Sequence, residues 1–77
     1  MSIMLVLKNI VRHDGLIGAD YYPEAGEEKY RITVNIKTGK VNDHGSKKSG
    51  YLIHAKAKLL RLAKLENLPK EATEIWY

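Results

Sequence analysis

The chain of 77 residues has no cysteine, no phenylalanine, two prolines and one tryptophan. Without cysteine it can form no disulfide, no thiolate metal site and no cysteine nucleophile. The apolar start Met1–Leu7 ends at Lys8 and lacks the pattern of a secretory signal, and no stretch approaches the roughly 20 apolar residues that span a bilayer. These absences predict a soluble, cytoplasmic protein with no membrane partner.

The length allows one domain over residues 1–77. A core of this size buries only roughly 60% of the surface that the unfolded chain exposes, so its stability is expected to be marginal. No segment repeats, and none is of low complexity.

The formal charge of +4 is distributed unevenly along the chain. Residues 1–28 carry two basic against five acidic side chains, a net of −3, and residues 65–77 carry one against three, a net of −2. Residues 29–64 carry ten basic side chains against one acidic, a net of +9. A basic middle segment therefore lies between two acidic ends, which permits an anionic partner.

The first half of the chain is typical of antiparallel strands. Residues 3–12 predict a strand with Ile3, Leu5 and Leu7 on one face and Met4, Val6 and Ile10 on the other. Asp14-Gly15 favours a tight hairpin, because both residues tolerate positive φ, and residues 16–22 predict the returning strand, weakened by Gly18.

Residues 30–37 alternate apolar and polar side chains, which predicts a strand with one buried and one wet face. Thr38-Gly39 turns the chain into a short fourth strand that begins at residues 40–42, and residues 73–77 predict a last strand. The polar segments 23–28 and 43–50 predict loops.

Residues 51–67 have helical periodicity, with Leu52, Ala55, Leu59, Leu62 and Ala63 on one stripe, Ser49 as the N-cap and Asn67-Leu68-Pro69 as the end. The predicted class is therefore α+β: a mostly antiparallel sheet of four to five strands, in the chain order β-β-β-β-α-β, with one amphipathic helix on one face. The other face is expected to be partly exposed or closed by a second copy.

Four strings resemble those of short uncharacterised proteins from Gram-positive bacteria and their phages. The strings are Tyr21-Tyr22-Pro23-Glu24, Lys37-Thr38-Gly39-Lys40, His54-Ala55 and Trp76-Tyr77. The resemblance implies a compact bacterial or phage domain, and it implies no established activity.

The predicted helix carries a basic surface opposite its apolar stripe. His54, Lys58, Arg61 and Lys64 fall within an arc of about 120° of a helical projection. Lys47 and Lys48 precede the helix, in a Gly-Ser segment whose amides could hold an anion. Such a surface contacts phosphates in nucleic-acid binders, but the solvent face of an ordinary helix is also charged, and both interpretations stay open.

The side chains with catalytic or metal-binding potential are scattered. His13, His44 and His54 have no metal-ligand spacing, and neither Ser46 nor Ser49 lies in a nucleophile motif. The sequence indicates no cofactor and no metal, and it makes an enzyme improbable unless a site forms between copies of the chain.

The aromatic side chains are candidates for a protein interface, because tyrosine and tryptophan often anchor interfaces. The candidates are Tyr21, Tyr22, Trp76 and Tyr77. Completion of a small core without phenylalanine is the alternative for the same residues. The sequence thus favours a small non-enzymatic module that binds a protein or its own copy, with a nucleic-acid binder that uses Lys47, Lys48, Lys58, Arg61 and Lys64 as the alternative.

Overall fold

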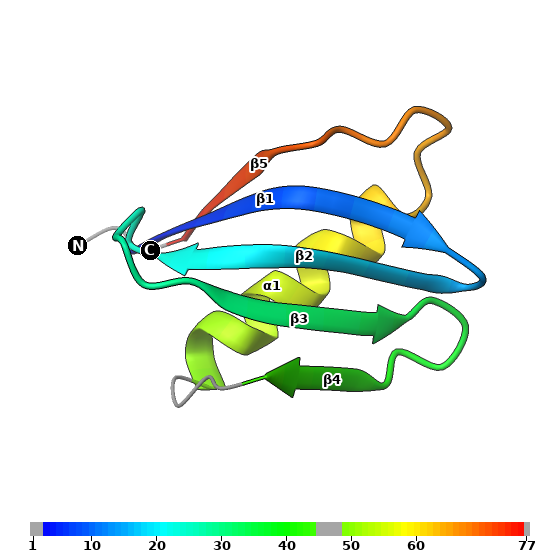
Figure 1. Cartoon of the computed structure of the whole chain (residues 1–77), viewed down its shortest axis with the longest axis horizontal. Helices are drawn as coiled ribbons and strands as arrows, with labels where there is room; N and C mark the ends of the chain where they lie inside the picture. Colours follow the sequence, from blue (N-terminus) through cyan, green and yellow to red (C-terminus); the bar gives the residue numbers. More distant parts are fainter. Residues whose placement is uncertain (1–2, 45–48, 77) are drawn as a thin grey trace.

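The computed structural model describes residues 3–44 and 49–76. Its elements are β1 (Ile3–His13), β2 (Leu16–Pro23), β3 (Tyr30–Asn35), β4 (Val41–His44), α1 (Ser49–Leu62) and β5 (Ala72–Trp76). All strands pair antiparallel in one sheet of order β4-β3-β2-β1-β5, and α1 crosses one face of it (Figure 1). The predicted α+β class and element order are confirmed, and the strand order, which the sequence left open, is now defined.

The core lies between α1 and the face of the sheet that it covers. Residues of β2 and β3 alternate between this face and the opposite one, as period-two strands require. The buried apolar side chains are Leu5, Leu7, Ile10, Ile17, Ala19, Tyr21, Ile32, Val34, Ala55, Leu59 and Leu62. Burial of these apolar side chains is the main favourable contribution to the free energy of folding.

A two-residue turn joins β1 to β2, as Asp14-Gly15 predicts. Asp14 has a φ of 49° and Gly15 a φ of 78°, and His13 pairs directly with Leu16. Positive φ at both central residues matches the right-handed twist of the flanking strands, so the turn fixes the register of this hairpin.

A β-bulge interrupts β1 and changes which face its residues occupy. The pairs Lys8–Asp20 and Val11–Gly18 leave two residues of β1, Asn9 and Ile10, opposite one residue of β2. Asn9 adopts a φ of 54°, which asparagine tolerates better than most residues. The assignment of Ile10 to the face of Met4 and Val6 is therefore wrong: the extra residue moves Ile10 into the core and turns Val11 outward.

Strand β3 ends two residues before the predicted position 37, because the side chain of Asn35 starts the turn. Its Oδ1 accepts hydrogen bonds from the amides of Lys37 and Thr38, each at 3.0 Å. Gly39 then donates its amide to the Asn35 carbonyl at 2.7 Å and has a φ of 75°. An Asx-type turn of this kind ends a strand locally.

Helix α1 ends at Leu62 and not at Asn67, and the end of β1 explains the difference. The Arg12 guanidinium donates to the carbonyls of Ala63 and Leu65, each at 2.8 Å, and of Glu66 at 3.3 Å. A cation at a helix C-terminus stabilises the helix end in two ways, because it donates hydrogen bonds to carbonyls that have no partner within the helix and interacts favourably with the negative end of the helix dipole. The chain then returns to place β5 beside β1, with Ile3 opposite Trp76.

The first turn of α1 is tied to the loop after β2. The Tyr51 hydroxyl donates to Glu24 Oε1 at 2.8 Å, and this hydrogen bond, with a smaller effect of burial, raises the pKa of Tyr51. Glu24 and Ala25 both have positive φ, 57° and 56°, which tightens this loop against the sheet. Side-chain hydrogen bonds to the loop after β2 and from β1 therefore hold α1 near both of its ends.

Candidate interaction surface

The face of the sheet opposite α1 is not covered by any element of the described chain; we call it the uncovered face. It is the face turned toward the viewer in Figure 1, with α1 behind it. Its side chains are the neighbours in sequence of the core residues, since successive residues of a strand point to opposite faces. Three of the large apolar side chains exposed on the molecule lie here: Val11, Leu16 and Ile75.

One apolar part of this face lies at the turn end of β1 and β2; we call it the hairpin patch, and it consists of Val11, Leu16, Gly18 and Thr33. Val11 is 52% exposed and Leu16 is 42% exposed. Gly18 pairs with Val11 on one side and Thr33 on the other, so the glycine leaves a low point between two larger residues. The residues around it, including Arg31 and His13, line a hollow of about 180 Å³.

Gly18 is favoured here by close packing and not by its φ. A Cβ at this position would lie 3.1 Å from Arg31 Nη2 and 3.2 Å from the Ile32 carbonyl oxygen. The Ile32 oxygen is backbone and cannot yield easily. The glycine that weakened the predicted strand therefore lets Arg31 fold down over β2 and forms the floor of the hollow.

A second apolar part lies at the opposite end of the same face; we call it the strand-end patch, and it consists of Met4, Val6, Tyr22 and Ile75. The cross-strand pairs Met4–Ile75 and Val6–Tyr22 place these side chains next to one another. Ile75 is 52% exposed, and the Lys8 ammonium lies 5.1 Å from the centre of the Tyr22 ring. This distance allows a cation–π contact that holds the lysine against the aromatic ring.

An ion pair separates the two patches. Arg31 Nη1 lies 3.3 Å from Asp20 Oδ1, and Asn9 donates its side-chain amide to Asp20 Oδ2 at 2.8 Å. Burial by itself would raise the pKa of Asp20, but the hydrogen bonds from Asn9 and Arg31 and the Arg31 charge outweigh it, so that this pKa is lowered. The middle of the uncovered face is therefore polar and carries charges of both signs, since Lys8 is the cross-strand neighbour of Asp20.

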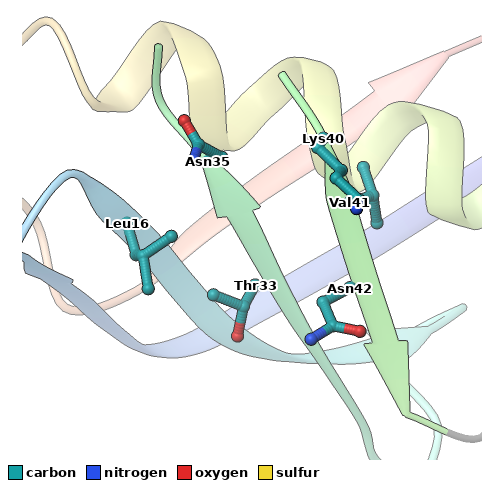
Figure 2. Close-up of a pocket in the computed structure, with 6 residues that line it drawn as sticks. All are labelled: Leu16, Thr33, Asn35, Lys40, Val41 and Asn42. Carbon is teal, nitrogen blue, oxygen red and sulfur yellow. The ribbon is translucent and has the colours of Figure 1, made fainter. Parts of the chain in front are cut away.

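A shallow hollow of about 300 Å³ extends the hairpin patch toward β4. Figure 2 shows Leu16, Thr33 and Asn42 on the side of the sheet away from α1, with Asn35 and Lys40 at the adjoining strand ends. The Asn35 oxygen is already engaged by two backbone amides of the turn. The residues that line this hollow thus surround the exposed Leu16 with both polar and apolar groups.

The basic surface predicted on α1 is only partly assembled. Arg61 forms an ion pair with Glu74 of β5, so an acidic residue distant in sequence offsets part of the charge. Lys58 and His54 are half-buried on the flank of the helix, and Lys64 is exposed. Lys47 and Lys48 lie outside the described residues.

The four aromatic residues predicted for an interface occupy different environments. Tyr21 has no exposed surface and stacks at 5.5 Å between ring centres with Tyr30, so it belongs to the core and not to a surface. Tyr22 lies half-buried in the strand-end patch. The backbone of Trp76 pairs with Ile3 in β5, but its side chain and Tyr77 lie outside what the structure describes.

Val11, Leu16 and Ile75 were missed by the sequence reasoning. For Val11 the available signal was Asn9, a polar residue within an apolar strand. Asparagine tolerates positive φ, and here it marks the bulge that turns Val11 outward. Leu16 and Ile75 carried no signal, because an apolar residue in a strand is assigned to the core unless the position of the helix is known.

No protein-family model matches this chain, and neither a curated protein nor a solved structure is significantly similar to it. The resemblance to short proteins of Gram-positive bacteria and their phages therefore stays a prediction. Within residues 3–44 and 49–76, no three His, Asp or Glu side chains gather as a metal site. The helix in the same part of the chain is too short and too polar to cross a membrane.

Proposed function

We propose that this chain is a small protein-interaction module, working in the cytoplasm, that binds through the uncovered face of its sheet. The observation that carries this proposal is that three exposed aliphatic side chains share one face, Val11 and Leu16 in the hairpin patch and Ile75 in the strand-end patch. Apolar side chains that gather on a surface with a polar border are typical of association sites. The ion pair of Asp20 and Arg31 adds a polar group that a partner must match, which favours a specific contact over general adhesion.

The border of the face supports the same function. Lys8 and Tyr22 provide a cation and an aromatic ring at the strand-end patch, and Tyr is one of the residue types that contribute most binding energy in interfaces. The hydroxyl and amide groups of Thr33 and Asn42 lie next to Leu16. A partner would thus meet apolar side chains surrounded by hydrogen-bonding groups.

A capture experiment with matched variants tests this proposal. The immobilised chain is exposed to a lysate of its host as wild type, as Leu16→Glu and as Ile53→Glu. Ile53 is 64% exposed on the opposite side of the molecule, so its variant introduces the same charge without touching the uncovered face. We expect Leu16→Glu to lose proteins that the wild type and Ile53→Glu both retain. Identical capture by all three, or loss with Ile53→Glu alone, would remove the proposal.

A nucleic-acid binder is the second candidate, and the specific observation in its favour is the composition of α1. No acidic residue lies on the helix itself, Arg61 is exposed in its last turn, and Lys64 is exposed in the turn that follows the helix. Binding would be mainly electrostatic. The logarithm of the affinity would fall as the logarithm of the salt concentration rises, and each phosphate contact that is lost would make this dependence shallower by about 0.9.

The test for this candidate leaves the Arg61–Glu74 pair in place. Lys58→Gln/Lys64→Gln is compared with Lys37→Gln/Lys70→Gln, a control that removes the same charge from exposed lysines elsewhere. Fluorescence anisotropy with duplex and single-stranded oligonucleotides at low salt should show weaker binding only for the helix variant. No binding by the wild type, or equal loss in both variants, would exclude a dedicated site on α1.

A further inference from the structure

The partner that best fits the uncovered face is a second copy of the same chain. We infer that two copies stack their uncovered faces against each other, with each α1 on the outside, to form a symmetric dimer. This inference rests on the proposed function and names the occupant of the same surface.

The first argument is area. The strands have 11, 8, 6, 4 and 5 residues. At a strand spacing of about 4.8 Å and a rise of about 3.3 Å, each strand residue covers roughly 16 Å², and the face therefore covers roughly 550 Å². Two stacked faces would bury roughly 1,100 Å² before side-chain relief is counted, which exceeds the roughly 1,000 Å² expected of a biological interface.

The second argument is charge. On the uncovered face Arg31 is paired with Asp20, and Lys8 is held against Tyr22. Arg61, which is paired with Glu74, lies on α1, and the exposed Lys64 lies in the turn just after α1, so both are away from the uncovered face. Stacking of the uncovered faces keeps these cations far apart and exposed to water, whereas helix-to-helix contact would bring like charges together.

The third argument is shape. The face carries both protruding side chains and a hollow that could receive one: Leu16, Val11 and Ile75 protrude, and a shallow hollow bordered by Arg31 lies between Val11 and Leu16. In a two-fold contact, the same surface supplies both members of each complementary pair, so one face with both features can pair with itself. The Asp20–Arg31 pair lies between the two apolar patches, so it can meet the same ion pair of the second copy with opposite charges adjacent.

Sedimentation equilibrium of the whole chain tests the inference over roughly 10 μM to 1 mM. This concentration range suits a dimer whose buried area is small for a specific protein–protein interface. We expect the wild type to form dimers with increasing concentration. Leu16→Glu and Val11→Glu should each raise the dimer dissociation constant by about tenfold or more, because each places an unpaired carboxylate in an apolar contact. Ile53→Glu should leave the constant within about twofold, because surface changes away from an interface have small effects.

Two controls keep the outcomes distinct. Circular dichroism of each variant establishes that it is folded; if Leu16→Glu is not, the milder Leu16→Thr replaces it, with loss of dimer again expected. A wild type that stays monomeric to about 1 mM overturns the inference, since a stable face-to-face pair would be populated there. If Leu16-dependent capture of a host protein persists in that case, the proposed function stands with a different occupant. Dimers weakened by Ile53→Glu and not by Leu16→Glu would overturn both.

Discussion

The two faces of this sheet are made by the same strands but meet different surroundings. On the side of α1, Leu5, Leu7 and Ile32 have no exposed surface. On the other side, Val11, Leu16 and Ile75 are about half exposed, and an ion pair lies between the two patches that they belong to. The covered face is mainly apolar, with Arg12 and Glu74 as its charged exceptions, while the uncovered face mixes apolar side chains with charges of both signs.

This difference indicates separate roles for the two faces. A mainly apolar face is suited to permanent burial, and mixed polarity is suited to a surface that is exposed to water in one state and covered in another. The covered face should therefore determine stability, and the uncovered face should determine association. Changes on the two faces should have effects that can be measured independently.

The largest expected effect is on the free energy of unfolding, when one leucine on each face of the sheet is truncated to alanine. Leu59→Ala removes a fully buried side chain that packs α1 on the sheet and should lower the free energy of unfolding by about 2–5 kcal/mol. Leu16→Ala, on the uncovered face, should lower it by about 0.5 kcal/mol when the protein is monomeric. Urea denaturation at low protein concentration measures both values, and comparable losses would contradict the division of roles.

The next largest effect is the difference in stability loss between substitutions at two adjacent residues of β1. Arg12 holds the carbonyls at the end of α1, while Val11 belongs to the hairpin patch. Arg12→Ala should cost about 1–2 kcal/mol, because it leaves helix-end carbonyls without their charged donor. Arg12→Lys keeps the charge but not the three-way hydrogen bonding, and it should recover only part of the loss. Val11→Ala should change stability less and dimer formation more.

The smallest effect concerns pH and the ion pair of the uncovered face. The lowered pKa of Asp20 means that its ionised form is favoured in the folded state. Its contribution is therefore complete above the unfolded pKa of about 3.9 and is lost as the pH falls through the lower folded pKa. Asp20→Asn should reduce stability at neutral pH by at most about 1 kcal/mol, and its unfolding midpoint should approach that of the wild type as the pH falls below about 4. A difference that stays constant down to pH 2, or one that grows, would show that the carboxylate charge is not the cause.

Much of the fold could be predicted from the sequence because it depends on local patterns. The Asp14-Gly15 hairpin, the alternation over residues 30–35 and the apolar stripe of α1 each lie within a few residues of one another. The errors came from contacts between distant residues. Arg12 sets the end of α1 from about fifty residues away, and Asn9 shifts the faces of β1 through a bulge that only the pairing with β2 reveals.

The candidate surface was harder to predict for the same reason. A basic stripe can be recognised along one helix, but Glu74 reaches Arg61 from another element and offsets it. The uncovered face combines residues of β1, β2, β3 and β5, and its members resemble core residues until the position of α1 is known. Of the aromatic residues, Tyr21 and Tyr22 are adjacent in sequence, and strand alternation alone placed one in the core and the other on the uncovered face.

The most direct measurement is a nuclear magnetic resonance titration of the isotope-labelled wild type, with amide shifts recorded from about 20 μM to about 1 mM, where a weak symmetric pair becomes populated. If the uncovered face is the surface of association, shifts should move with concentration at Val11, Leu16, Thr33 and Ile75 and stay constant at Ile53 and Lys64. Movement confined to α1, or spectra that do not change with concentration, would contradict self-association through this face.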